Sequence, residues 1–127
     1  MKSYQEAVKE FMQAFGQNTP EKVNIENYPF ALRADLVIEE AQEFARACEM
    51  RDPVAMLDAI CDLLYVVHGA SIAMGVDIDP FFWEVHSSNM SKLDPITGKP
   101  IYRDDGKVLK SSAYRPPDLY KIYKQIA

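Results

Sequence analysis

Residues 36–64 read LVIEEAQEFARACEMRDPVAMLDAICDLL, and this stretch decides the fold. Apolar residues recur at three- and four-residue intervals on both sides of Asp52-Pro53, which is typical of packed α-helices. Asp52 is a good N-cap and Pro53 suits the first position of a helix, so a new helix begins just after the previous one ends. The stretch therefore predicts two helices, over about residues 31–50 and 53–74, joined by a short turn.

The same spacing predicts two more helices on either side of this pair. One covers residues 4–15 and ends at Gly16, and the other covers residues 81–92 and is started by Asp79-Pro80 in the manner of Asp52-Pro53. Four helices joined mostly by short loops predict the all-α class, as an antiparallel four-helix bundle.

Beyond Lys92 prolines and glycines recur and helical spacing is lost. Asp105-Gly106 stands between Ile101-Tyr102 and Val108-Leu109, which predicts a small β-hairpin, and residues 118–126 suit one more short helix. We therefore expect residues 1–92 to form a helical domain and residues 93–127 to be a basic C-terminal extension of the same domain.

The charge of the chain is unevenly distributed. Its 127 residues are 48% hydrophobic, enough for a core, and carry a net charge of −5, which argues against a nucleic-acid polymer as partner. Residues 1–91 carry 6 basic and 15 acidic groups, whereas residues 92–127 carry 8 basic and 4 acidic groups. An acidic body is thus followed by a basic tail.

Several features predict a cytoplasmic protein without a membrane partner. Cys48 and Cys61 lie in apolar helical contexts without metal-ligand spacing, so we expect buried, reduced thiols. The first residues alternate charged with apolar side chains and lack the hydrophobic run of a secretory signal. The apolar stretch 59–76 is interrupted by Asp62 and His68, which favours a buried core helix over a membrane span.

Five acidic residues stand out on the central helices. On the helix over 31–50, Glu40 falls near the middle of the apolar arc, Glu43 inside its edge and Glu39 just outside it. On the helix over 53–74, which is apolar nearly all round, Asp58 and Asp62 are four residues apart and share one face. The sequence thus directs several carboxylates toward the core side.

Buried carboxylates need compensation by bases, by protons or by cations. The core faces of these helices offer only Arg33 as a base, and protonating several groups at neutral pH would need very large shifts. Oxygen ligands without a histidine cluster suit Mg²⁺, or alternatively Mn²⁺. A di-iron bundle would use Glu-x-x-His, but neither histidine follows a glutamate by three residues. Ordinary solvated acids are the alternative interpretation.

Glu39-Glu40-x-x-Glu43, followed by Asp58 and Asp62 on the next helix, resembles the signature of the all-α nucleoside triphosphate pyrophosphohydrolase superfamily. This group includes the MazG-like proteins, the dimeric dUTPases and the phosphoribosyl-ATP pyrophosphohydrolases. The resemblance covers residues 1–92. The sequence Ser88-Asn89-Met90-Ser91-Lys92 and the glycine- and lysine-containing tail are similar to short MazG-like proteins of bacteria and phages.

The resemblance implies Mg²⁺-dependent hydrolysis of a nucleoside triphosphate between its α- and β-phosphates, which releases the monophosphate and pyrophosphate. Glu40, Glu43 and Asp62 match the metal ligands, and Glu39 matches the position proposed to activate the attacking water or to support a metal. Many members carry Glu-x-x-Asp on the second helix. Here Ala59 stands three residues before Asp62, so Asp58 takes the place of the fourth metal ligand.

The resemblance also bears on the basic end of the chain. Asn89 and Lys92 match substrate contacts, with a plain helix C-terminus as the alternative. The same positive field is extended by Lys107, Lys110 and Arg115, with a solvated tail as the alternative. Homodimers or homotetramers are implied as well, in agreement with a helix that has more apolar surface than one chain can bury. Tyr65, one turn after Asp62, either stacks on a base or packs.

A second class of function stays open at this point. A non-catalytic helical module for oligomerisation or regulation would carry the same helices, with its acids as ligand-free surface. The sequence names neither the base nor the sugar of a substrate, and it does not distinguish a nucleoside triphosphate from an alarmone or a phosphoribosyl nucleotide.

Overall fold

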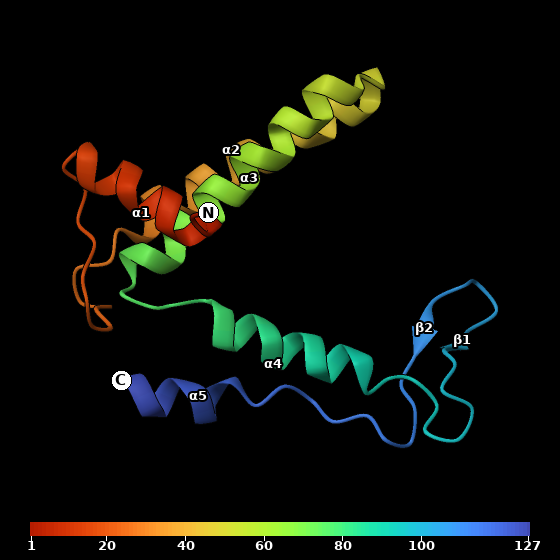
Figure 1. The fold of residues 1–127 in the computed structure, drawn as a ribbon. Coiled ribbons are helices and arrows are strands. Elements are labelled where there is room, and N and C mark those ends of the chain that lie inside the picture. Colours follow the sequence, from red (N-terminus) through yellow and green to blue (C-terminus); the bar gives the residue numbers. More distant parts are fainter. The chain divides into compact units, whose positions relative to one another are not determined.

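The structure, a computed structural model, describes residues 1–127 and contains five helices and one two-stranded hairpin (Figure 1). The predicted all-α class with a small hairpin near the C-terminus is confirmed. The chain forms two compact units, Met1–Asp77 and Ile78–Ala127. The first contains three of the four predicted bundle helices, and the fourth lies in the second unit.

The first unit consists of α1 (Tyr4–Ala14), α2 (Phe30–Met50) and α3 (Pro53–Ala73). Asp52 caps α3 as predicted, because its carboxylate accepts the backbone N–H groups of Val54 and Ala55 at 3.1 and 3.2 Å. Arg51, in the left-handed conformation at φ 53°, ends α2. The turn between the two long helices is therefore only two residues long.

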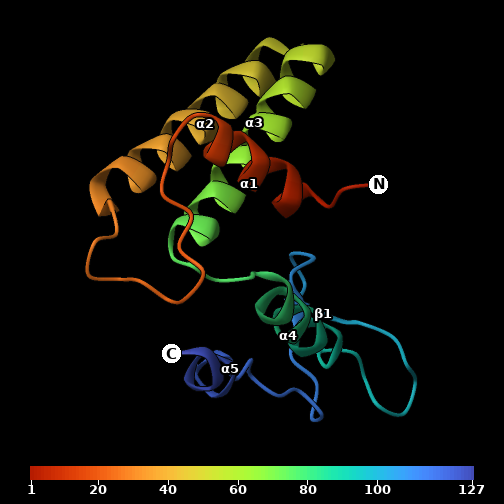
Figure 2. The same cartoon turned by 60° about the vertical axis from the view of Figure 1, so that its left-hand side comes forward.

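The two long helices pack side by side along their length (Figure 2). Two close pairs lie symmetrically about the Arg51 turn: Glu40 and Asp62 are each 11 residues from it, and Arg33 and Gly69 are each 18 residues from it. An antiparallel helix pair with a tight turn produces this register. Residues at equal distances from Arg51 consequently face each other.

Helix α1 packs on α3, which is the central helix of this unit as predicted. The core contains Val8 and Met12 of α1 with Ile72 and Ala73 of α3, and Tyr28 packs against it. The Tyr28 hydroxyl donates a 2.8 Å hydrogen bond to the carbonyl of Ala70. This small core fixes the C-terminal part of α3.

Gly75 ends α3 in a conformation that only glycine tolerates. Its φ is +75°, and a Cβ at this position would lie 2.0 Å from the carbonyl oxygen of Lys22. The neighbouring Met74 carbonyl accepts the N–H of Asn24 at 2.8 Å. The loop between α1 and α2 is thereby tied to the end of α3.

The second unit contains α4 (Asp79–Met90), β1 (Ile101–Tyr102), β2 (Val108–Leu109) and α5 (Leu119–Ile126). The strands pair antiparallel at the predicted positions, with Ile101 opposite Leu109. Contacts place α4 with the tail and divide the chain after Asp77, whereas the predicted domain limit lies at residue 92. The predicted domain ranges stay a prediction.

The prediction that Asp79 would cap α4 was wrong. Asp79 is already the first helical residue, Ile78 is the N-cap, and no side chain caps the helix. Ile78 has helical dihedral angles (φ −73°, ψ −20°), so the chain turns one residue earlier than the Asp-Pro pair indicates. Asp52, in contrast, is extended (φ −100°, ψ 103°), as an N-cap requires.

Hydrogen bonds join the segment 111–118 to α4. The Ser88 hydroxyl donates to the Arg115 carbonyl at 2.9 Å, and the Ser111 hydroxyl donates to the Ser91 carbonyl at 2.8 Å. Glu84 accepts both the Arg115 guanidinium, at 3.0 Å, and the Asp118 N–H, at 2.8 Å. The tail therefore runs back along α4, and the loop between Ser91 and Ser111 is closed at its base.

The outer side of α3 departs from the expected buried helix. Leu57, Ile60, Leu64 and Val67 are exposed, and only 22% of the most apolar 18-residue window is buried. By length and composition alone α3 could cross a membrane. Cys61 is also exposed, which contradicts the buried thiol expected there, although both cysteines are free as expected.

Candidate metal centre

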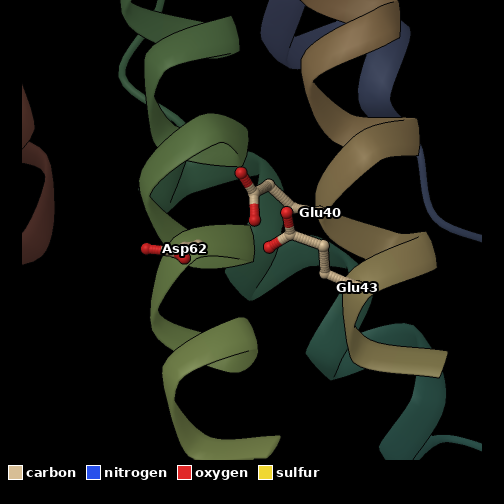
Figure 3. A group of neighbouring side chains, drawn as sticks. All are labelled: Glu40, Glu43 and Asp62. Atoms are coloured by element: carbon tan, nitrogen blue, oxygen red, sulfur yellow. The ribbon is translucent and has the colours of Figure 1, made fainter. Parts of the chain in front are cut away.

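Three of the five acids singled out from the sequence come together between α2 and α3. Glu40 and Glu43 lie one turn apart on α2, and Asp62 reaches them from α3, so that one oxygen of each lies within 4.8 Å of the others (Figure 3). The register about the Arg51 turn places Asp62 opposite Glu40. The apolar arc that contains Glu40 faces α3, which explains why Glu40 is half-buried, whereas Glu43 at the edge of the arc is exposed.

The electrostatics of this cluster disfavour three bare negative charges. Glu40 is half-buried, and its Oε2 atom is buried without any hydrogen-bond partner. Burial, and then the charges of Glu43 and Asp62, raise the pKa of the Glu40 carboxyl. Burial, and then the charges of Asp58 and Glu43, raise the pKa of Asp62. No ion pair joins a basic side chain to any of the three.

Arg33, the base that the sequence offered, does not neutralise the cluster. Its guanidinium lies beside Gly69, where a Cβ would come within 2.9 Å of Nη1, two helical turns from Glu40. Two turns of helix correspond to roughly 10 Å. The unpaired negative charge near Glu40 is therefore not neutralised by this side chain.

The donor set fits a small hard cation. Three carboxylates and no histidine or thiolate are the ligands that Mg²⁺ or Mn²⁺ prefers. Oxygens that share one Mg²⁺ lie at most about 4 Å apart, because each is roughly 2.1 Å from the ion. The 4.8 Å spread therefore requires only small side-chain rotations, and the cation would satisfy the orphaned Glu40 oxygen.

Asp58 and Glu39 lie outside the group of three. Asp58 is exposed, one turn before Asp62, and acts on it through its charge. Glu39 is exposed on α2 and makes a smaller contribution to the raised pKa of Glu40. A fourth metal ligand at Asp58 and a catalytic role for Glu39 stay predictions.

The four predicted substrate contacts all belong to the second unit. Asn89 is exposed in the last turn of α4, and Lys92 follows the helix, which ends at Met90. Lys107 lies on the hairpin turn, and the Lys110 ammonium lies 4.8 Å from the ring centre of Tyr114. Their contact with a nucleotide stays a prediction.

Sequence reasoning missed the residues that hold this region in place. Ser88 in the last turn of α4, Ser91 just after the helix and Ser111 in the tail make hydrogen bonds that join the two segments. The spacing of Ser88 and Ser91 was a usable signal, because small hydroxyl residues on one helix face often bind a neighbouring segment.

A carboxylate cluster on two antiparallel helices, in an all-α chain without a glycine-rich phosphate loop, fits the class of all-α nucleotide pyrophosphohydrolases. Comparison with protein families agrees. The phosphoribosyl-ATP pyrophosphohydrolase family matches residues 8–89, and the chain therefore belongs to this family.

Solved structures similar to this chain include a pyrophosphohydrolase as well. Among 24 matching chains, a protein from Exiguobacterium sp. 255-15, assigned provisionally as an NTP pyrophosphohydrolase, is 25% identical. The match covers 98% of this chain and 96% of that one, with a TM-score of 0.54. No curated protein matches the sequence.

Proposed function

We propose that the protein hydrolyses a nucleoside triphosphate between the α- and β-phosphates and that it requires Mg²⁺, with Mn²⁺ as an alternative. The family supports a hydrolase of the nucleoside triphosphate pyrophosphohydrolase type. One observation carries the metal dependence: Glu40 Oε2 is buried without a partner beside two further carboxylates. A cation between the three carboxylates would offset their mutual repulsion when they are ionised and would provide a partner for the buried Glu40 oxygen.

Each residue of the candidate site has a proposed role. Glu40, Glu43 and Asp62 hold the cation, with Asp58 assisting Asp62 by charge or as a further ligand. Glu39, exposed beside them, accepts a proton from the attacking water. When bound, the cation supplies charge neutralisation at the phosphates and makes water more acidic. Asn89, Lys92, Lys107 and Lys110 contact the substrate's phosphates.

Pyrophosphate release from a panel of nucleoside triphosphates tests this function. We expect turnover with at least one triphosphate in the presence of Mg²⁺ or Mn²⁺, and none after chelation with EDTA. Release of orthophosphate instead of pyrophosphate would show a different bond specificity. Absence of turnover, together with no effect of either metal on thermal stability, would favour the non-catalytic helical module.

We also propose that a second copy of this chain covers the outer side of α3, in a homodimer or homotetramer. Leu57, Ile60, Leu64 and Val67 follow one another at three- and four-residue spacing on the side of α3 that points away from α2. An apolar stripe of this kind is characteristic of an interface between subunits. We further propose that the protein is cytoplasmic and that it binds neither a membrane nor a nucleic-acid polymer.

Replacing Leu64, which is 40% exposed, by glutamate is expected to dissociate the assembly. The charge would be buried in the apolar interface without a partner. Light scattering after size exclusion measures the mass. Ile96→Glu is the control, because Ile96 is 93% exposed in a loop of the other unit. An unchanged mass of the Leu64 variant would exclude this face as the interface.

A further inference from the structure

A groove of about 360 Å³ lies between α1 and α3 of the first unit. Its walls carry three aromatic rings: Phe11 and Phe15 of α1, with ring centres 4.5 Å apart, and Tyr65 of α3, which meets Phe11 edge-on at 5.7 Å. Two alanines of α1 complete the apolar surface. A volume of this size is at the lower end of the range for small-ligand sites.

One residue of the groove wall, Tyr65, is close in sequence to a residue of the carboxylate cluster. Tyr65 follows Asp62 by three residues on α3, so the two side chains are neighbours on the helix surface. One oxygen of Asp62 lies within 4.8 Å of an oxygen of each glutamate (Figure 3). A ligand whose charged part is held by Asp62 and the two glutamates would therefore have its remaining part next to Tyr65.

The chemistry of the groove suits a flat aromatic ring. Phe15 is 70% exposed and Tyr65 44% exposed, which leaves ring faces available for stacking. The polar groups at the groove are Lys2 and Glu10, and these form an ion pair with each other. The groove therefore offers ring faces but few free groups that could read the edge of a base by hydrogen bonding.

We propose that this groove binds the nucleobase of the triphosphate held at the carboxylate cluster. The inference rests on the proposed function and extends it to the choice of substrate. Because stacking tolerates every base, the enzyme discriminates little between bases and favours purines, whose larger rings cover more of the groove. Leu64, which belongs to the apolar stripe that we assign to a second copy, lies about 100° around α3 from Tyr65, so the groove is a separate surface.

Tyr65→Leu and Phe15→Leu test the proposal by steady-state kinetics with ATP and Mg²⁺. Loss of one stacking partner is expected to raise KM roughly tenfold. We expect kcat to stay within about twofold, because the base makes the same contact before and during the reaction. Tyr120→Leu, at an exposed ring of α5, is the control and should leave both constants unchanged. Phe15 follows the end of α1 and is largely exposed, so its replacement keeps the fold.

A binding measurement separates this proposal from the proposed function. The ring resonances of Tyr65 and Phe15 are followed by NMR while AMP or ribose 5-phosphate is added. Shifts of these resonances with AMP but not with ribose 5-phosphate support a base in the groove, whether or not the protein hydrolyses triphosphates. If both variants turn over substrate with unchanged KM and AMP shifts neither resonance, the groove does not bind the base. The proposed function would still stand. A change of oligomeric mass in Phe15→Leu with unchanged KM would assign the groove to a second copy and likewise overturn it.

Discussion

Replacement of Glu43 by glutamine is expected to lower pyrophosphate release at least about a thousandfold while the protein stays folded. Glu43 supplies one of the three oxygens that lie within 4.8 Å of one another, and glutamine keeps the size but removes the charge. Loss of a charged ligand that stabilises phosphate charge in the transition state corresponds to about 4 kcal/mol, or three powers of ten in rate. The assay is pyrophosphate release at saturating Mg²⁺ and substrate.

The same substitution should make the metal-free protein slightly more stable. The charge of Glu43 raises the pKa of both Glu40 and Asp62, which means that it repels their ionised forms. Thermal unfolding in EDTA therefore gives a higher midpoint for Glu43→Gln than for the wild type. Glu49→Gln, at an exposed glutamate of the same helix outside the cluster, is the matched control for both measurements. Wild-type turnover in Glu43→Gln would contradict a metal centre at this site.

The fold was predictable wherever a local signal determines the backbone. Asp52-Pro53 and Gly75 mark the two ends of α3, and Asp105-Gly106 marks the hairpin, because each restricts the dihedral angles or caps free N–H groups. The Asp79-Pro80 pair shows the limit of such signals. It is the same dipeptide as Asp52-Pro53, but the preceding Ile78 is already helical, so the aspartate enters the helix instead of capping it.

The inward-facing acids were predictable from helical periodicity, and their partners were predictable from the short turn. A two-residue turn places Asp62 opposite Glu40, since both are 11 residues from Arg51. By the same symmetry Asp58, seven residues after Arg51, lies opposite Phe44 and not opposite a glutamate. Asp58 is exposed and stays outside the group of three even though it shares a helix face with Asp62.

The second unit was harder to predict, because its contacts depend on pairs far apart in the sequence. The hydrogen bond from Ser88 to the Arg115 carbonyl spans 27 residues, and that from Ser111 to the Ser91 carbonyl spans 20. Neither belongs to a repeating pattern. The basic charge of the tail was visible in the composition, but the attachment of the tail to α4 required the structure.

Addition of Mg²⁺ is expected to stabilise the protein strongly at neutral pH and hardly at all near pH 4. The pKa of Glu40 and of Asp62 is higher in the folded protein than in the unfolded chain, where carboxyl groups titrate near pH 4. Without metal, the two groups therefore favour the folded state below their unfolded pKa. This contribution is lost as the pH rises through their folded pKa, since ionisation then costs more in the folded protein.

A bound cation reverses the preference, because it requires the ionised carboxylates. At a Mg²⁺ concentration of about 100 times the dissociation constant, binding contributes roughly 2.7 kcal/mol, which corresponds to a rise of about 10 °C in the unfolding midpoint for a chain of this length. Thermal unfolding is measured with Mg²⁺ and with EDTA between pH 4 and pH 8, and the difference between the two unfolding midpoints should grow with pH.

The variant Glu40→Gln/Asp62→Asn is the control. Mg²⁺ should not raise its unfolding midpoint. Without metal, its stability should also not show the decrease with rising pH that these two carboxyls cause in the wild type. If wild type and variant respond alike to Mg²⁺ at pH 7, the stabilising cation binds elsewhere. If their metal-free midpoints change in parallel with pH, the raised pKa values do not govern the stability of the helix pair.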